Sequence, residues 1–105
     1  MKRVKRRYLA LLLDGDFAVG EQEFLDAVWG ALYKLYGEYG ASLAGLVLVG
    51  FDGEARQAVL RANLVALDSV RASLASITHI SGREAAVHVL AVSGTLKALR
   101  RNAGA

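Results

Sequence analysis

The stretch LVLVGFDGEARQAVLRA, from Leu46 to Ala62, decides the fold expected for this chain of 105 residues. It contains two apolar runs separated by the polar segment DGEA, which includes a glycine. Short apolar runs on either side of such a turn predict a β-hairpin, with strands over Leu46–Phe51 and Arg56–Ala62. The centre of the chain is therefore two consecutive strands, and the fold depends on the segments that flank them.

A helix is predicted on each side of this hairpin. Before it, apolar residues recur at helical spacing from Glu21 to about Gly37, with acidic residues in the first turns, and Gly37 and Gly40 are expected to end the helix. After the hairpin, Asn63 is expected to cap a second helix. The apolar residues of that helix form the predicted buried stripe: Leu67, Val70, Leu74 and Ile77.

A further strand is predicted outside each helix. The apolar run Arg7–Leu13 ends at Asp-Gly-Asp, and the run Ala85–Val92 follows a Ser-Gly-Arg turn. The resulting order, β-α-β-β-α-β, is the ferredoxin-like or split βαβ pattern, an α/β (α+β) sandwich in which helices cover one face of the sheet. We expect one domain over residues 1–105, long enough to bury a core without a disulfide.

The closing segment AVSGTLKALRR, Ala91–Arg101, predicts an added C-terminal helix. Ser93, Gly94 and Thr95 are suited to leaving a strand and capping a helix that begins near Thr95. Three basic residues then share one face and three apolar residues the other: Lys97, Arg100 and Arg101 against Leu96, Leu99 and Ala103. A helix start beside a cationic stripe favours phosphate, although basic residues in a last turn also simply solvate a helix end.

Positive charge is concentrated at both ends of the chain. The formal net charge is only +3, yet basic residues gather at the two ends of the sequence. Near the N-terminus they are Lys2, Arg3, Lys5, Arg6 and Arg7, and near the C-terminus they are the three of the predicted last helix. Such a distribution suits a polyanionic partner, and a solubilising tail remains the alternative for the N-terminal cluster. Residues 1–6 are expected to form a basic tail, and residues 102–105 to be disordered.

Two of the predicted strands, Arg7–Leu13 and Leu46–Phe51, are apolar at both odd and even positions. A strand with one face in water should alternate apolar and polar residues instead. The second face of the sheet therefore needs a cover, either the C-terminal helix or another protein. The first of these strands offers only Tyr8 as an aromatic, and Arg56–Ala62 offers none. This argues against base stacking on an open sheet and favours phosphate and shape contacts if RNA is bound.

Several classes of chemistry find little support in the composition. The absence of cysteine excludes disulfides and thiolate sites, and the two histidines lack a zinc-binding spacing. Asp14 and Asp16 could hold a metal, but such a pair more often ends a strand. Ser93 has no recognisable base near it in sequence, so no catalytic residue is expected. With no apolar run near 20 residues, we expect a cytoplasmic protein that does not contact a membrane.

Four segments together resemble a known family: RYLALLL, AVWGALYKLYGEYGAS, VRASLASITHISGREAAVHVLAVSGT and VSGTLKALRR. They are similar to ribonuclease P protein component 2, the archaeal counterpart of the eukaryotic Pop-five subunit, from about Arg7 to Arg101. The resemblance implies an α/β sandwich like the RNA-recognition motif, in a ribonucleoprotein that cleaves the 5′ leader from precursor tRNA. It also implies that the RNA is the catalyst and needs Mg²⁺, and that this chain binds no cofactor.

The same resemblance implies the partners: the ribonuclease P RNA, the TIM-barrel-like component 3 protein, and precursor tRNA through the holoenzyme. A homodimer is also compatible with the apolar sheet face. The residues expected to bind RNA are Ser93, Gly94, Thr95, Lys97, Arg100, Arg101, Lys5, Arg6 and Arg7. The positions of four further arginines in the sequence do not show whether they contact RNA or only solvent: Arg56, Arg61, Arg71 and Arg83. The alternative function is a small regulatory or dimerisation domain of ferredoxin-like fold that binds no RNA.

Overall fold

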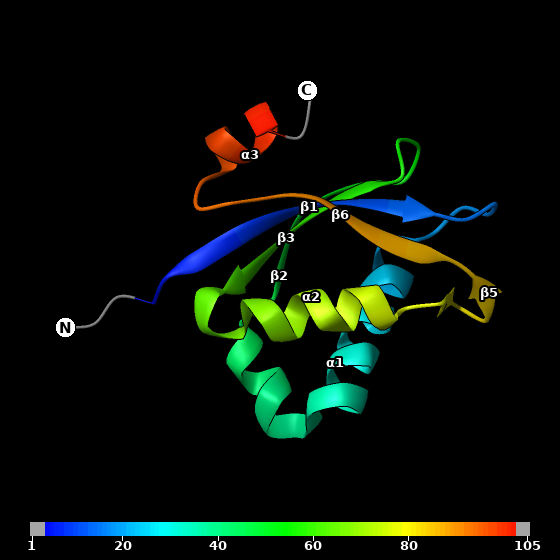
Figure 1. Ribbon diagram of the computed structural model, residues 1–105. Helices are drawn as coiled ribbons and strands as arrows, with labels where there is room; N and C mark the ends of the chain where they lie inside the picture. Colours follow the sequence, from blue (N-terminus) through cyan, green and yellow to red (C-terminus); the bar gives the residue numbers. More distant parts are fainter. Residues whose placement is uncertain (1–3, 103–105) are drawn as a thin grey trace.

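The computed structural model describes residues 4–102 and contains the predicted ferredoxin-like sandwich (Figure 1). Four antiparallel strands form one sheet in the order β2-β3-β1-β6. The strands of that sheet are β1 (Arg6–Asp14), β2 (Val47–Asp52), β3 (Gln57–Asn63) and β6 (Ala86–Ser93). The remaining elements are α1 (Glu21–Ala44), the 3₁₀ turn η1 (Leu64–Ala66), α2 (Leu67–Ser76), the two-residue strands β4 (His79–Ile80) and β5 (Arg83–Glu84), and α3 (Leu96–Asn102).

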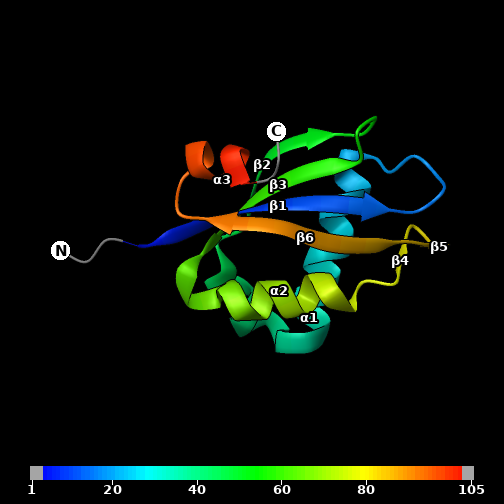
Figure 2. The same ribbon diagram turned by 45° about the horizontal axis from the view of Figure 1, so that its top comes forward.

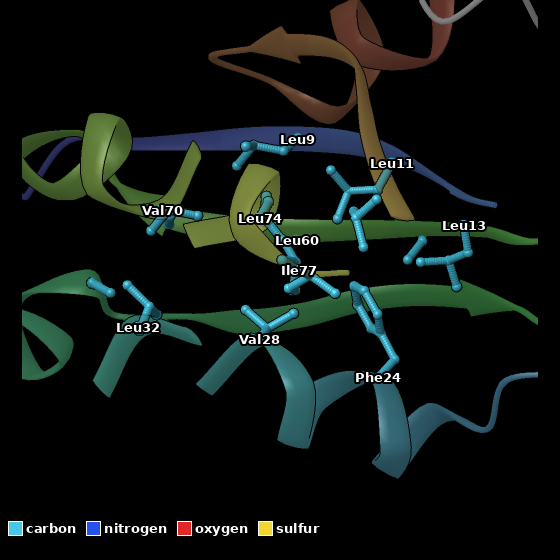
Figure 3. Packing of buried hydrophobic residues seen from close by; sticks show 14 of the residues in the cluster. Leu9, Leu11, Leu13, Phe24, Val28, Leu32, Leu60, Val70, Leu74 and Ile77 are labelled. Carbon is cyan, nitrogen blue, oxygen red and sulfur yellow. The ribbon is translucent and has the colours of Figure 1, made fainter. Parts of the chain in front are cut away.

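The two faces of the sheet have different covers. Helices α1 and α2 lie on one side, here called the helical face, and α3 lies on the other, the outer face (Figures 1 and 2). On the helical face, buried leucines of β1 and β3 meet one apolar stripe from each helix (Figure 3). The labelled residues of this core are Leu9, Leu11, Leu13, Phe24, Val28, Leu32, Leu60, Val70, Leu74 and Ile77. The predicted stripe of α2 is therefore confirmed, with Leu67 half-buried at its start.

The register of the sheet aligns four residues into one row that crosses all four strands. Tyr8 of β1 lies opposite Arg61 of β3 and opposite Ser93 of β6, and Arg61 lies opposite Val47 of β2. Directly paired residues share a face, and their neighbours along the strands, such as Leu9, belong to the core on the helical face. This cross-sheet row, Val47-Arg61-Tyr8-Ser93, consequently lies on the outer face.

Helix α1 is longer than its sequence predicts. Gly37 does leave helical geometry, with φ 71° and ψ −174°, but the chain resumes its helix and ends only at Gly45, which has a left-handed φ of 55°. The segment after Gly37, residues 38–44, is retained because Ala41 and Ala44 are buried in the core. Gly37 therefore interrupts the helix where an end was expected, whereas the helical segment that follows, up to Ala44, was not predicted and no helix ends at Gly40.

The expected cap of the second helix is also wrong. Asn63 makes no capping hydrogen bond, and η1 intervenes between it and α2. Its side-chain Nδ2 instead donates to the carbonyl oxygen of Leu43 at 3.0 Å. The last carbonyls of a helix lack partners within the helix, so the end of α1 offers this amide an acceptor. The link joins the end of α1 to the end of β3.

The described ends of the chain are more ordered than expected. Strand β1 begins at Arg6, and the carbonyl oxygen of Lys5 accepts from the backbone N–H of Leu64 at 2.8 Å, so part of the predicted tail belongs to the fold. Asn102 closes α3. The remaining residues of both predicted tails, 1–3 and 103–105, including Ala103 of the expected apolar face, lie outside the described residues.

The outer face is covered in part by α3, as one of the two alternatives expected. Leu99 is only 1% exposed and Ala10 of β1 is also buried, whereas Val47 and Leu90 keep 41% and 46% of their surface exposed. Within residues 4–102, no helix combines the length and apolar character needed to cross a membrane.

Candidate nucleic-acid interface

Antiparallel pairing brings the two basic ends of the chain together. Because β1 and β6 run in opposite directions, the start of β1 lies beside the end of β6, with Tyr8 opposite Ser93. A Cβ built on Gly94 would lie 3.8 Å from Nη1 of Arg7, so the first basic cluster reaches the turn that precedes α3. We call the resulting surface the basic end: Lys5, Arg6, Arg7, Lys97, Arg100 and Arg101, together with the turn Ser93–Thr95.

The turn before α3 is built as its residue types indicate. The hydroxyl of Thr95 accepts a hydrogen bond from the backbone N–H of Ala98 at 3.2 Å, which confirms Thr95 as the cap. The Ser93 hydroxyl accepts from the N–H of Thr95 at 3.5 Å, a weak local contact. The described helix has only seven residues, so charged side chains rather than the helix dipole must supply most of any attraction for phosphate.

Gly94 does not have the special conformation that would make glycine necessary. Its φ is not among the positive values found in the chain, and a Cβ there would meet Arg7 at an ordinary van der Waals distance. A close approach of RNA to this glycine therefore stays a prediction.

Helix α3 has the expected two faces. Its three cations, Lys97, Arg100 and Arg101, are exposed. Leu99 is buried and Leu96 half-buried, and the helix contacts β6 and β1. The apolar side chains thus hold the helix on the sheet while the cations face solvent.

Carboxylates are absent from the segments of chain that build the basic end. No Asp or Glu occurs in residues 4–13, 55–67 or 86–102. Acidic residues gather at the opposite end of the sheet and the adjoining loop and helix start: Asp14, Asp16, Glu21, Glu23, Asp52 and Glu84. The single ion pair within the part of the chain that the structure describes also lies there, between His88 Nε2 and Asp14 Oδ2 at 3.5 Å. The cations of the basic end consequently have no ion-pair partner among residues 4–102.

The fold gives different surroundings to the four arginines whose sequence spacing does not distinguish RNA-binding residues from solvated ones: Arg56, Arg61, Arg71 and Arg83. Arg83 lies over the ring of Phe17 at 5.2 Å, Arg56 sits in a turn with φ 56°, and Arg71 is exposed on α2. Only Arg61 lies in the cross-sheet row, close to the basic end. The signal that could have placed it is the alternation along β3, where Ala58, Leu60 and Ala62 are buried in the core and the residues between them must face outward.

Metal ligands do not gather in the described part of the chain. Among residues 4–102 no group of three or more His, Asp or Glu side chains could hold a metal ion. Asp14 is the last residue of β1, and Asp16 lies in the loop that follows.

Comparisons with known proteins agree with this geometry. The model of the Rpp14/Pop5 family matches residues 7–104. The chain is 32% identical over 99 residues to ribonuclease P protein component 2 of Pyrococcus furiosus, a match that covers 94% of this chain and 82% of that protein. It is 33% identical over 95 residues to the protein of the same name from Methanosarcina barkeri, covering 90% of this chain and 69% of that one.

A solved structure has the same fold. A chain in the cryo-EM structure of yeast ribonuclease MRP superposes with a TM-score of 0.75 over 91% of this chain and 79% of that chain. The two sequences are 17% identical, so the likeness is one of fold.

Proposed function

Because the chain belongs to the Rpp14/Pop5 family, we propose that it is a protein subunit of the ribonuclease P ribonucleoprotein, which removes the 5′ leader from precursor tRNA. In this assembly the RNA, with its Mg²⁺, carries the chemistry. The chain supports that chemistry by binding the catalytic RNA and the component 3 protein, and it meets precursor tRNA only through the holoenzyme.

The observation that carries this proposal is the basic end. Six cations from opposite ends of the sequence share one region of the fold, and the segments that present them, residues 4–13 and 86–102, contain no Asp or Glu. Unpaired Lys and Arg side chains bind the RNA backbone by displacing counterions from its phosphates. The arrangement supports contact with phosphates, which sets position and affinity, rather than a readout of bases.

A binding experiment across a salt series tests the basic end. We expect the triple variant Lys97→Ala, Arg100→Ala and Arg101→Ala to fold normally, because these side chains are exposed. Its affinity for the ribonuclease P RNA should fall, and the slope of log affinity against log salt should decrease by up to about three, at ~0.7 to 0.9 per lost contact. The double variant Lys34→Ala and Arg71→Ala removes exposed cations from helices on the other face of the sheet, and it should change little.

Each outcome of that experiment has a distinct meaning. If the triple variant binds RNA as the original chain does at every salt concentration, the surface lies elsewhere, and Lys5, Arg6 and Arg7 become the next residues to change. If the unaltered chain binds no structured RNA even at low salt, the regulatory or dimerisation domain becomes the better description.

A cleavage assay tests where the catalysis lies. We expect the isolated chain to leave precursor tRNA intact and to raise cleavage only when the RNA subunit is present, because the proposal assigns the chemistry to the RNA. Leader removal by a preparation shown to be free of RNA would contradict this assignment.

A further inference from the structure

Arg61 lies on the outer face of β3, one of the two central strands, beside the basic end. In the cross-sheet row it stands directly opposite Tyr8, which in turn stands opposite Ser93 of the turn before α3. With strands spaced about 4.8 Å apart, the backbone of Arg61 is roughly 10 Å from that of Ser93. The row therefore leads from the basic end across β1 to a further cation on β3.

The side chain of Arg61 is partly buried and its charge is not neutralised. The residue is half-buried, and its Nε atom is buried without a hydrogen-bond partner. Among residues 4–102 no carboxylate forms an ion pair with it. Because Nε is buried, an acceptor from outside the described chain has to meet the guanidinium at its two Nη groups, for which no hydrogen bond is found among residues 4–102.

Phosphate is the acceptor that this environment fits. The neighbouring cations raise the local positive potential, and a guanidinium can bind a phosphate with two parallel hydrogen bonds. Arg61 is half-buried, whereas Arg100 and Arg101 are exposed, so its side chain has fewer rotamers open to it than theirs. Less ordering is then needed when the ligand binds.

We propose that Arg61 binds a backbone phosphate of the RNA and extends the phosphate-binding surface from β6 and α3 across β1 to β3. This inference rests on the proposed function and deepens it, because it adds a binding residue on a central strand of the sheet. It predicts that the RNA lies across the outer face, along the cross-sheet row, and does not contact α3 alone.

The test compares three changes at Arg61 with one at Arg71. Arg61→Met and Arg61→Gln remove the charge and keep much of the stem, Arg61→Lys keeps the charge, and Arg71→Met removes an exposed cation from α2. Binding of the ribonuclease P RNA is measured across a salt series, with thermal melting recorded for each variant. We expect Arg61→Met and Arg61→Gln to lower the salt slope by about 0.7 to 0.9, and Arg61→Lys and Arg71→Met to leave the slope near its original value.

The melting temperature separates this binding role from a structural one. Removing an unpaired buried donor should leave the melting temperature of Arg61→Met unchanged or higher, while RNA affinity falls. A lower melting temperature with an unchanged salt slope in both uncharged variants, measured where they are folded, overturns the proposal and makes Arg61 a packing residue.

The α3 triple variant, measured in parallel, distinguishes a failure of the inference about Arg61 from a failure of the proposed function. If that variant loses affinity and the uncharged Arg61 variants bind as the original chain does, the inference about Arg61 is wrong and the proposed function stands. If all of these variants bind as the original chain does, neither α3 nor Arg61 contacts the RNA, the inference about Arg61 is wrong, and Lys5, Arg6 and Arg7 are the part of the basic end still to be changed.

Discussion

At the scale of single residues, the end of α1 shows how one position can depend on another far along the chain. Gly45 adopts a left-handed backbone with φ 55°, and a Cβ added there would collide with the side-chain amide of Asn63. That amide donates to Leu43 in the last turn of α1. A glycine, a helix end and a strand end are thus coupled in one small arrangement.

Gly45→Ala should therefore destabilise the protein, whereas Gly30→Ala should not. A left-handed backbone costs a residue with a Cβ about 1 to 2 kcal/mol, and the collision with Asn63 adds to this cost. Gly30 lies within α1 with open space around it, so alanine there should raise the free energy of unfolding by up to about 1 kcal/mol. Urea denaturation of both variants provides the measurement, and equal stability of Gly45→Ala and the unaltered chain would contradict the explanation.

At the scale of elements, α3 is a short helix held by few contacts. It has seven residues, one side-chain cap and one fully buried side chain, Leu99. Isolated helices of this length are unstable in water, so packing on the sheet must maintain it. Presentation of the cations consequently depends on an apolar contact on the opposite side of the same helix.

Leu99→Ala should lower the free energy of unfolding by about 2 to 5 kcal/mol if the cavity does not collapse. It should also weaken RNA binding, because α3 no longer holds its cations in place. Lys97→Ala on the same helix is the control, since its side chain is exposed and its loss should leave stability nearly unchanged. Denaturant titration and amide hydrogen exchange of α3 report the two effects. Unaltered protection of α3 in Leu99→Ala would show that other contacts hold the helix.

At the scale of the whole molecule, two different surfaces lie on opposite sides of the sheet. Helix α3, which carries three cations, lies on the outer face, and the part of α1 after the kink at Gly37 lies on the opposite side of the sheet (Figure 1). The part of α1 after Gly37 and the helical turn just before Gly37 expose aromatic and aliphatic side chains: Tyr33, Leu35, Tyr36, Tyr39 and Leu43. Tyr39 is the most exposed of them, at 78%. A group of large apolar side chains in water is typical of a surface that binds another protein.

We expect this α1 surface to contact component 3 or a second copy of the chain. The variant Tyr39→Ser with Leu43→Ser should reduce co-purification of component 3, or shift a dimer to a monomer in light scattering, without loss of fold. Val65→Ser is the matched control, since Val65 is 80% exposed but lies on η1. A strictly monomeric chain that also fails to co-purify component 3 would refute the expectation, and a monomer that still binds component 3 would limit it to that partner.

Much of the fold could be predicted because its signals are local. Short apolar runs, helical spacing and turn residues placed the strands of the main sheet, the two long helices and α3 in the correct order. The errors fall where distant contacts outweigh local preference. Buried alanines carry α1 past Gly37, and the open carbonyl of Leu43 takes the amide of Asn63 away from capping. The two-residue strands β4 and β5 are too short to produce a pattern at all.

The sequence by itself determined the order of the elements, the two faces of α3 and the basic character of both chain ends, because each depends on residues near one another in the chain. Only the tertiary structure decided that those ends meet, since antiparallel pairing places Tyr8 beside Ser93. It alone also distinguished Arg61 from Arg56, Arg71 and Arg83, which have the same charge but different neighbours. Pairing across a sheet joins residues more than 80 positions apart, and no local pattern in the sequence records which ones they are.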